Sequence, residues 1–140
     1  MGIGSLRLGM TRQEAEATGM VPPFRADGQG NCVWTSHLTD AVSADSLAGT
    51  VLESPRLGIA AIFAYGTVGT PEQIRLGSSA ADATRAYPGA RLDGSADHGY
   101  LYAGVPGNAD AWYRVEFQAG KVTEIVLQLN NQDCFELPTF

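Results

Sequence analysis

The sequence has no apolar stretch long enough to cross a bilayer and no cluster of basic residues. The longest apolar run, residues 57–65, is far shorter than the roughly 20 residues that a membrane-spanning helix needs. Eight arginines and one lysine are spread singly along a chain of net charge −6. Because phosphate binding requires clustered positive charge, we expect neither nucleic acid nor an anionic membrane surface as a partner.

Motifs for nucleophilic, metal and phosphate chemistry are also lacking. The chain contains no G-x-S-x-G elbow, no H-E-x-x-H sequence and no phosphate-binding loop. Its histidine, cysteine and acidic residues form no cluster with the spacing of a metal site. We therefore expect no cofactor and no metal ion.

Histidine is scarce, and its two copies are the only candidates for acid–base catalysis. His98 follows Asp97, and a His–Asp pair can act as a general base. Adjacent residues of a strand point to opposite faces, however, so Asp97 is badly placed to orient the imidazole. The simpler interpretation of both His98 and His37 is that they are solvated surface residues.

Cysteine is equally scarce. Cys32 and Cys134 lack the close spacing of a redox or zinc motif. In a cytosolic protein they would be unrelated core residues, whereas in an exported protein they would pair. A bond would close a loop of about 100 residues, which the chain-entropy model values at about 4–5 kcal/mol. No signal peptide precedes the first structured-looking segment. Because the cysteines favour pairing, we expect a secreted or cell-envelope protein whose signal peptide has been removed.

What the sequence does contain is an internal repeat. An apolar residue, arginine, leucine and glycine occupy residues 6–9, and the same order returns at residues 74–77. A hydroxyl residue suited to cap a helix follows each, Thr11 in the first copy and Ser79 in the second. An acidic residue stands three positions after each cap, which is the spacing of a capping box. Each copy therefore predicts a turn followed by the start of a helix.

Two helices and six strands follow from these signals and from residue alternation. The helices are predicted over residues 12–18 and 80–86. We expect an α+β fold of two tandem helix-plus-antiparallel-strand repeats, residues 1–68 and 69–140, in one compact unit that shares one sheet with helices on one face. The strands are predicted at residues 32–38, 50–53 and 58–64 in the first repeat, and at 99–103, 111–118 and 121–129 in the second.

The last two predicted strands form the clearest hairpin. Tyr113, Val115 and Phe117 alternate with polar residues in the first strand. Residues 119–120 (Ala-Gly) make a tight turn, and apolar alternation resumes at residues 123, 125, 127 and 129. The pattern predicts a hairpin with one buried face.

Residues 6–15, with the order apolar-x-Leu-Gly-Met-Thr-x-x-Glu-Ala, resemble the opening of two related families. One comprises outer-membrane assembly lipoproteins of the SmpA/OmlA (BamE-like) type. The other comprises the β-lactamase inhibitory (BLIP-like) proteins of actinomycetes, which carry two tandem copies. The second segment, through residues 86–88, is also similar to a repeat of uncharacterised secreted actinobacterial proteins.

This resemblance implies a fold and a kind of activity. The fold is a helical piece packed on antiparallel strands in each copy, with the strands in one continuous sheet. The activity is contact with another protein or with an envelope component. The motif specifies a turn and a helix start and covers about a fifth of the chain, so it identifies no functional residue. The single disulfide expected in this chain would join the two repeats, whereas the inhibitory pattern is expected to have one disulfide within each repeat. We therefore carry over no inhibitory residue.

Aromatic residues supply the candidate binding surface. An antiparallel sheet with helices on one side leaves its other face open. Tyrosine, tryptophan and arginine are the residue types enriched in interface hot spots. The alternative is that these aromatics pack on loops or on a second core face. By alternation, the residues expected on the open face are Trp34, Tyr100, Tyr102, Trp112 and Arg114, with Phe63 and Glu116 beside them.

These observations favour an exported, non-enzymatic binding module. It would be inhibitor-like and would contact a protein or envelope partner through the aromatic sheet face or the edge loops. The alternative is a small-ligand-binding protein with an aromatic pocket. A small enzyme that uses His98 or His37 is the least favoured hypothesis.

Overall fold

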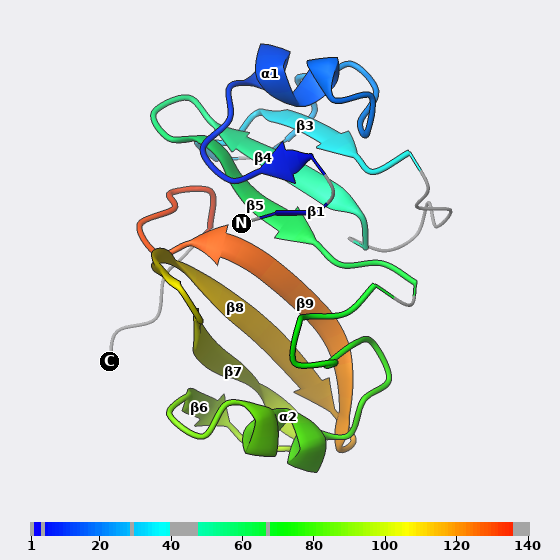
Figure 1. Ribbon diagram of the computed structural model, residues 1–140, viewed down its shortest axis with the longest axis vertical. Helices are drawn as coiled ribbons and strands as arrows, with labels where there is room; N and C mark the ends of the chain where they lie inside the picture. Colours follow the sequence, from blue (N-terminus) through cyan, green and yellow to red (C-terminus); the bar gives the residue numbers. More distant parts are fainter. Residues whose placement is uncertain (1, 4, 29, 40–47, 67, 136–140) are drawn as a thin grey trace.

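The computed structural model describes residues 2–3, 5–28, 30–39, 48–66 and 68–135. Figure 1 shows the two helices at opposite ends of a long curved sheet. In chain order the elements are β1 Gly2–Ile3, β2 Leu6–Arg7, α1 Arg12–Ala17, β3 Trp34–His37, β4 Thr50–Ser54, β5 Gly58–Phe63, α2 Ala80–Ala86, β6 Arg91–Gly94, β7 His98–Val105, β8 Asn108–Gln118 and β9 Lys121–Leu129.

Seven of the strands form one antiparallel sheet. Their order is β3-β4-β5-β9-β8-β7-β6, while β1 and β2 pair separately as a small hairpin. The two halves of the chain meet where β5 pairs with β9, through Ala61–Gln128, Ile62–Leu127 and Phe63–Val126. Strands of both predicted repeats, residues 1–68 and 69–140, therefore belong to the same sheet. The boundary between the two repeats stays a prediction.

The expected fold class, α+β with two helix-plus-strand repeats, is wrong. The helices have only six and seven residues, so they cannot form a layer over a seven-stranded sheet. Gly19 takes φ 76° just beyond α1, and Pro88 follows α2, so neither helix is prolonged. The helices bury only the methyl groups of Ala15, Ala80 and Ala83. The strands therefore supply most of the core.

Local predictions fare better than the fold class. The helix at residues 80–86 is confirmed, and the helix predicted over 12–18 ends one residue earlier. All six predicted strands are present with small differences at their ends. The sequence analysis missed β6 and the β1–β2 hairpin, because these strands are short and β6 is exposed throughout.

The predicted helix starts are confirmed. Glu14 N–H donates to Thr11 Oγ1 at 3.1 Å, and Thr11 N–H donates to the Glu14 carboxylate at 3.0 Å, which completes a capping box. Asp82 N–H donates to Ser79 Oγ at 3.0 Å. The hydroxyls of Thr11 and Ser79 thus act as caps, as expected from their spacing to the acidic residues.

The two similar turns before the helices contact the sheet in the same way. Gly9 has φ 87° and Gly77 has φ 89°, a conformation that favours glycine. Gly9 N–H donates to the carbonyl of Ile59 in β5, and Gly77 N–H donates to the carbonyl of Val122 in β9, each at 2.8 Å. In return, Ile59 N–H donates to the Met10 carbonyl, and Val122 N–H donates to the Ser78 carbonyl. The similarity of the two segments thus extends to how each turn docks on a central strand.

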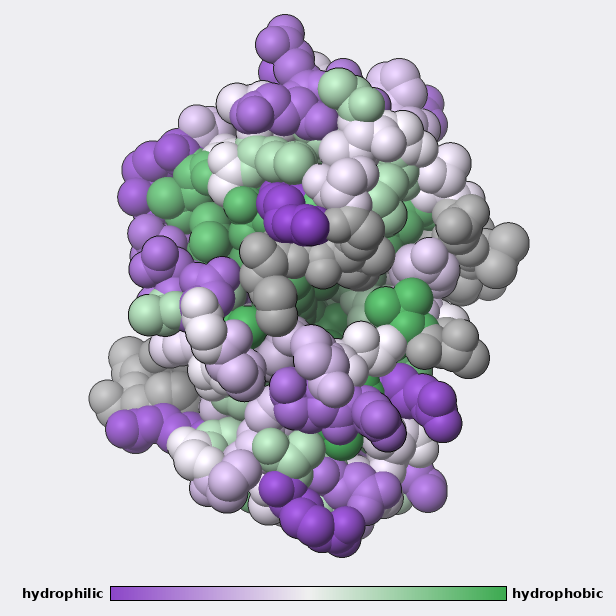
Figure 2. Space-filling model, viewed as in Figure 1, coloured by the Kyte–Doolittle hydropathy of each residue, from purple (hydrophilic) through white to green (hydrophobic). Residues whose placement is uncertain are grey.

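Two buried clusters lie on the helix side of the sheet. They adjoin where Ile62 of one cluster pairs with Leu127 of the other. In Figure 2, hydrophobic residues show mainly in the middle of the molecule, among hydrophilic residues that also cover its two ends. The cluster near α1 comprises Leu6, Ala15, Val21, Phe24, Leu38, Val51, Ile59 and Ile62, and the cluster near α2 includes Leu101, Tyr113, Val115, Phe117, Val122 and Ile125.

One predicted position in the hairpin is wrong. Thr123 was expected on the buried face, but it is exposed. Glu116 pairs with Glu124 and Phe117 pairs with Val122, so Thr123 is an extra residue at a bulge. Because a one-residue shift reverses the faces, Val122 occupies the core position beside Phe117.

Candidate binding face

The face of the sheet away from the helices carries four of the five residues predicted there, Tyr100, Tyr102, Trp112 and Arg114. Tyr102 pairs in register with Arg114, Tyr100 pairs with Glu116, and Trp112 pairs with Gln128. Because directly opposed residues share one face, these side chains form a continuous surface over β7, β8 and β9. We call the surface formed by Tyr100, Tyr102, Trp112, Arg114 and Glu116 the open face.

Arg114 lies at the centre of the open face. Its Nη2 donates to the Glu124 carboxylate at 2.8 Å, and both side chains are about four-fifths buried. The guanidinium carbon lies 5.0 Å from the ring centre of Tyr100 and 4.8 Å from that of Phe135. Two rings and one carboxylate thus hold the cation, an arrangement that restricts its orientation.

The tyrosines of the open face are packed and partly hydrogen-bonded. Tyr100 OH donates to the Glu116 carboxylate at 3.1 Å. Burial, followed by this hydrogen bond, raises the pKa of Tyr100. Burial also raises the pKa of Tyr102, against the opposing effect of the Arg114 charge. Both phenols therefore stay neutral at physiological pH and can donate hydrogen bonds.

Trp112 completes the aromatic part of the open face. Its ring meets that of Tyr102 edge-on, with centres 6.1 Å apart and planes at 67°. Tyr102 in turn lies 6.4 Å from Tyr100. All three rings are half-buried. A partner could therefore cover further area of each ring.

Trp34 does not join this surface. It lies in β3 beside α1, and the Arg12 guanidinium stacks 3.7 Å from its ring centre. Its neighbour in register, Glu53, accepts a hydrogen bond from Arg12 N–H at 3.1 Å. Trp34 and Ser36 are two residues apart in β3, so their side chains lie on the same face of the sheet. The Ser36 hydroxyl donates to the Pro22 carbonyl on the helix side, so Trp34 lies on that side as well. Phe63, by contrast, lies on the same side of the sheet as Arg114 but is buried.

The disulfide expected between Cys32 and Cys134 is present. It anchors residues 130–135, which we call the C-terminal strap, beside the open face. Within the strap, the buried Gln132 side chain accepts from the N–H groups of Cys134 and Phe135 and donates to the Phe135 carbonyl. Asn31 donates to the Asp133 carbonyl at 3.2 Å. These contacts fix the Phe135 ring over Val126 and beside Arg114.

The strap divides the sheet surface opposite the helices into two parts. Phe135 packs with Leu52 on a small buried cluster of Ala61, Phe63 and Val126. Over β4 and β5 this side of the sheet is thus closed by the chain itself. Over β7 and β8 the aromatic rings of the open face are half-buried.

Sequence reasoning missed Phe135 and Gln128. The available signal for Gln128 was a single polar residue within the apolar run 125–129 of a central strand. Its side chain is fully buried. Among the described residues, neither its amide nitrogen nor its amide oxygen has a hydrogen-bond partner, and the same holds for Nε of Arg114. Phe135 carried no local signal, because the disulfide determines its position.

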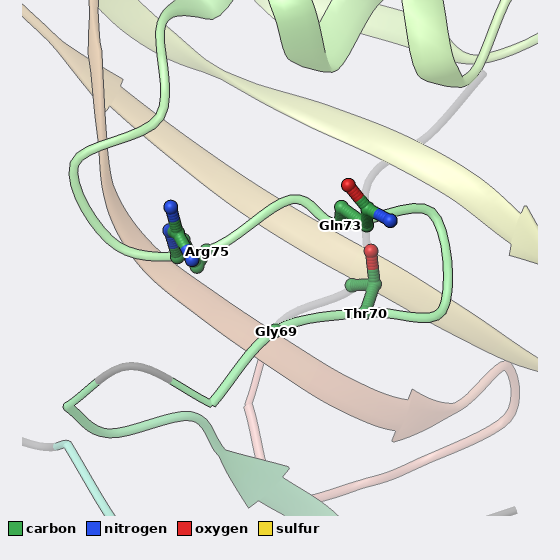
Figure 3. Close-up of a pocket in the computed structure, with 4 residues that line it drawn as sticks. All are labelled: Gly69, Thr70, Gln73 and Arg75. Carbon is green, nitrogen blue, oxygen red and sulfur yellow. The ribbon is translucent and has the colours of Figure 1, made fainter.

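A cavity of about 270 Å³ lies away from the open face, in the loop that precedes α2 (Figure 3). Gly69, Thr70, Gln73 and Arg75 line it. Figure 3 shows Thr70 and Gln73 close together, with Arg75 further along the same loop. The predicted aromatic residues do not contribute to this cavity, so it offers no support for an aromatic ligand pocket.

Among the described residues, neither histidine has a partner of the kind that acid–base catalysis uses. His37 and His98 are both exposed. His98 contacts Ser95 through its backbone groups, with the Ser95 hydroxyl accepting from His98 N–H at 3.3 Å. Within the described part of the chain, neither imidazole makes a hydrogen bond. The one group of potential metal ligands found there, Cys32, Asp133 and Cys134, contains the two disulfide-bonded sulfurs, which are not thiolate ligands.

No helix among the described residues has the length and apolar character to span a membrane. The disulfide is compatible with a secreted protein. Comparisons with protein-family models, curated proteins and solved structures give no match.

Proposed function

We propose that this chain is an exported, non-enzymatic interaction module that contacts a protein or cell-envelope partner through the open face. The observation that carries the proposal is the grouping of Tyr100, Tyr102, Trp112 and Arg114 on one side of β7 and β8. These residue types dominate the energetics of protein interfaces because each buries a large area and keeps a polar group. The resemblance of residues 6–15 to the inhibitory and assembly families agrees with this role.

The order already present in the open face also favours binding. Arg114 is held by Tyr100, Phe135 and Glu124, so little conformational entropy is lost when a partner covers it. The disulfide adds a reason to expect export, since such bonds persist in oxidising compartments. An inhibitor-like action would follow if the face covers the active site of the partner.

The test is a pull-down from the culture supernatant and envelope fraction of the producing organism. Bait protein would be wild type, Tyr102→Ala/Trp112→Ala, or Trp34→Ala. Trp34→Ala is the matched control, because it removes a tryptophan that lies off the open face. We expect the double variant to lose at least one partner that wild type and the control both retain.

A quantitative measurement follows from that result. The recovered partner should bind the double variant at least about 30-fold more weakly, since each hot-spot truncation costs about 1 kcal/mol or more. Circular dichroism and intact disulfide content would confirm that the variant is folded. Equal recovery of every partner by the folded double variant would refute the proposal.

A further inference from the structure

The floor of the open face contains polar atoms that the fold leaves unpaired. The Gln128 side chain is 0% exposed, yet neither atom of its amide has a hydrogen-bond partner among the described residues. Nε of Arg114 is also buried and has no hydrogen-bond partner among the described residues. Buried polar groups are almost always paired in folded proteins, because leaving water without a new partner is unfavourable. Three such atoms in one place therefore require a reason.

Register brings these atoms within reach of one another. Trp112 lies opposite Gln128, and Arg114 lies opposite Val126, so Arg114 and Gln128 are diagonal neighbours on the same face. Such neighbours have Cα atoms roughly 7–8 Å apart, which long side chains can bridge. One ligand can thus meet both side chains. Phe135, fixed by the strap, lies 4.8 Å from the Arg114 guanidinium carbon, and Tyr100 lies 5.0 Å from it.

The chemistry of the three atoms selects the ligand. The Gln128 amide offers one acceptor and a donor, and Arg114 Nε offers a further donor. An ionised carboxylate or phosphate has no hydrogen-bond donor for the Gln128 oxygen. A hydrocarbon can form no hydrogen bond with any of the three atoms. The main chain of a peptide presents a donor and an acceptor side by side on each residue.

Charge and ring geometry favour a peptide over an envelope glycan. The chain carries a net charge of −6, and Glu116 and Glu124 lie on this face, which suits a neutral or cationic segment. Sugars stack on exposed, flat ring faces. Tyr102 and Trp112 instead meet edge-on and are half-buried, so neither presents a fully exposed ring face.

We propose that the open face takes up an extended peptide segment of the partner and that the Gln128 amide pairs with the N–H and C=O of one of its residues. Arg114 Nε donates to a neighbouring carbonyl of the same segment. Because Gln128 is covered in the free protein, the adjacent Trp112 indole turns aside on binding, while Phe135 stays in place. This inference rests on the proposed function and names the chemistry of the contact.

The experiment uses a phage library of random dodecapeptides as the probe. Peptides are selected on wild type and their affinities are measured against Gln128→Met, which keeps volume and removes the amide. The matched control is Gln118→Met, because Gln118 is exposed at the end of β8. We expect Gln128→Met to bind at least about tenfold more weakly, the loss of one hydrogen-bonded pair, and Gln118→Met to bind as wild type does.

A backbone scan of the selected peptide isolates the main-chain contact. N-methylation at one position should weaken binding to wild type about tenfold and leave binding to Gln128→Met unchanged, as a double-mutant cycle requires. Emission from Trp112, followed in a Trp34→Phe background where it is the only tryptophan, should shift on binding. The absence of any emission change overturns the movement of the indole.

The outcomes separate this inference from the proposed function. If Tyr102→Ala/Trp112→Ala abolishes peptide binding while folded Gln128→Met binds normally, the amide pairing is wrong and the open face remains the binding surface. If no peptide is enriched and soluble peptidoglycan fragments bind in a Gln128-dependent way, a glycan is the ligand and the inference is wrong. If peptides bind but no N-methyl position distinguishes wild type from Gln128→Met, the main-chain contact is refuted.

Discussion

Removal of the Cys32–Cys134 bond should destabilise the protein more than any single side-chain contact. The two cysteines are 102 residues apart, so the bond restricts most of the unfolded chain. The chain-entropy relation gives about 4–5 kcal/mol for a loop of this length. A domain of ordinary stability has a free energy of unfolding of about 5–15 kcal/mol, so the loss is about a quarter of it or more.

The perturbation is the double variant Cys32→Ala/Cys134→Ala. Alanine avoids placing a hydroxyl at Cys32, which is 2% exposed. The strap keeps its hydrogen bonds to the Gln132 side chain, which are local to residues 132–135. The main effect therefore falls on the unfolded state, with a smaller loss where Phe135 packs against Arg114.

Urea titration followed by circular dichroism measures the effect. With a slope of about 2 kcal/mol per M, the midpoint should fall by roughly 2 M, and the slope should rise because the unfolded chain is no longer cross-linked. Wild type in reductant should shift to the midpoint of the double variant, and reductant should leave the double variant unchanged. Midpoints of oxidised wild type and double variant within 0.3 M (about 0.6 kcal/mol at that slope) would refute the chain-entropy argument for this bond.

Three further perturbations test other parts of the structure. Thr11→Ala removes the α1 cap and should lower the free energy of unfolding, measured by urea titration, by about 1 kcal/mol. The control Gln13→Ala on the same helix should change this free energy by less than about 0.5 kcal/mol. Equal effects of the two substitutions would contradict the capping assignment. Phe135→Ala should lower partner affinity about fivefold by freeing Arg114, and unchanged affinity would show that the strap plays no part in binding. Burial raises the pKa of Tyr113 to about 12. Unfolded tyrosine ionises near pH 10, so Tyr113 should leave the free energy of unfolding unchanged below pH 10 and lower it from there toward pH 12. Tyr113→Phe should make this fall smaller without abolishing it, because the pKa values of Tyr87, Tyr100 and Tyr102 are raised as well; a fall of unchanged size in urea titrations would contradict the assignment to Tyr113.

Local structure was predictable because its signals are contained in short segments. The capping residues at Thr11 and Ser79 and the glycines before them determine where each helix begins. Strand alternation in β8 likewise separated Tyr113 from Arg114. The fold class was wrong because a helix start says nothing about helix length. Both helices stop after two turns or fewer and leave the core to the sheet.

The candidate site was only partly predictable for a different reason. Neighbours within one strand follow from alternation, and Tyr100 and Tyr102 were placed together on that basis. Neighbours across strands depend on register, and the bulge at Thr123 shows that one extra residue alters it. Trp34 was grouped with the open face because its strand direction and parity were unknown from sequence.

The position of the open face follows from where the C-terminal strap lies. An antiparallel sheet covered by helices on one side exposes its other side to water, and that side is usually polar. Here the disulfide draws the strap back to Cys32, near the start of β3, and Phe135 covers the apolar residues of β5 and β9. The aromatic surface over β7 and β8 lies beyond the reach of this ring, and Arg114 marks the border between the two parts. The disulfide that stabilises the fold thus also determines which part of the sheet can contact a partner. A Phe135 variant and a disulfide variant should therefore both weaken binding. Only the disulfide variant should strongly lower the urea midpoint.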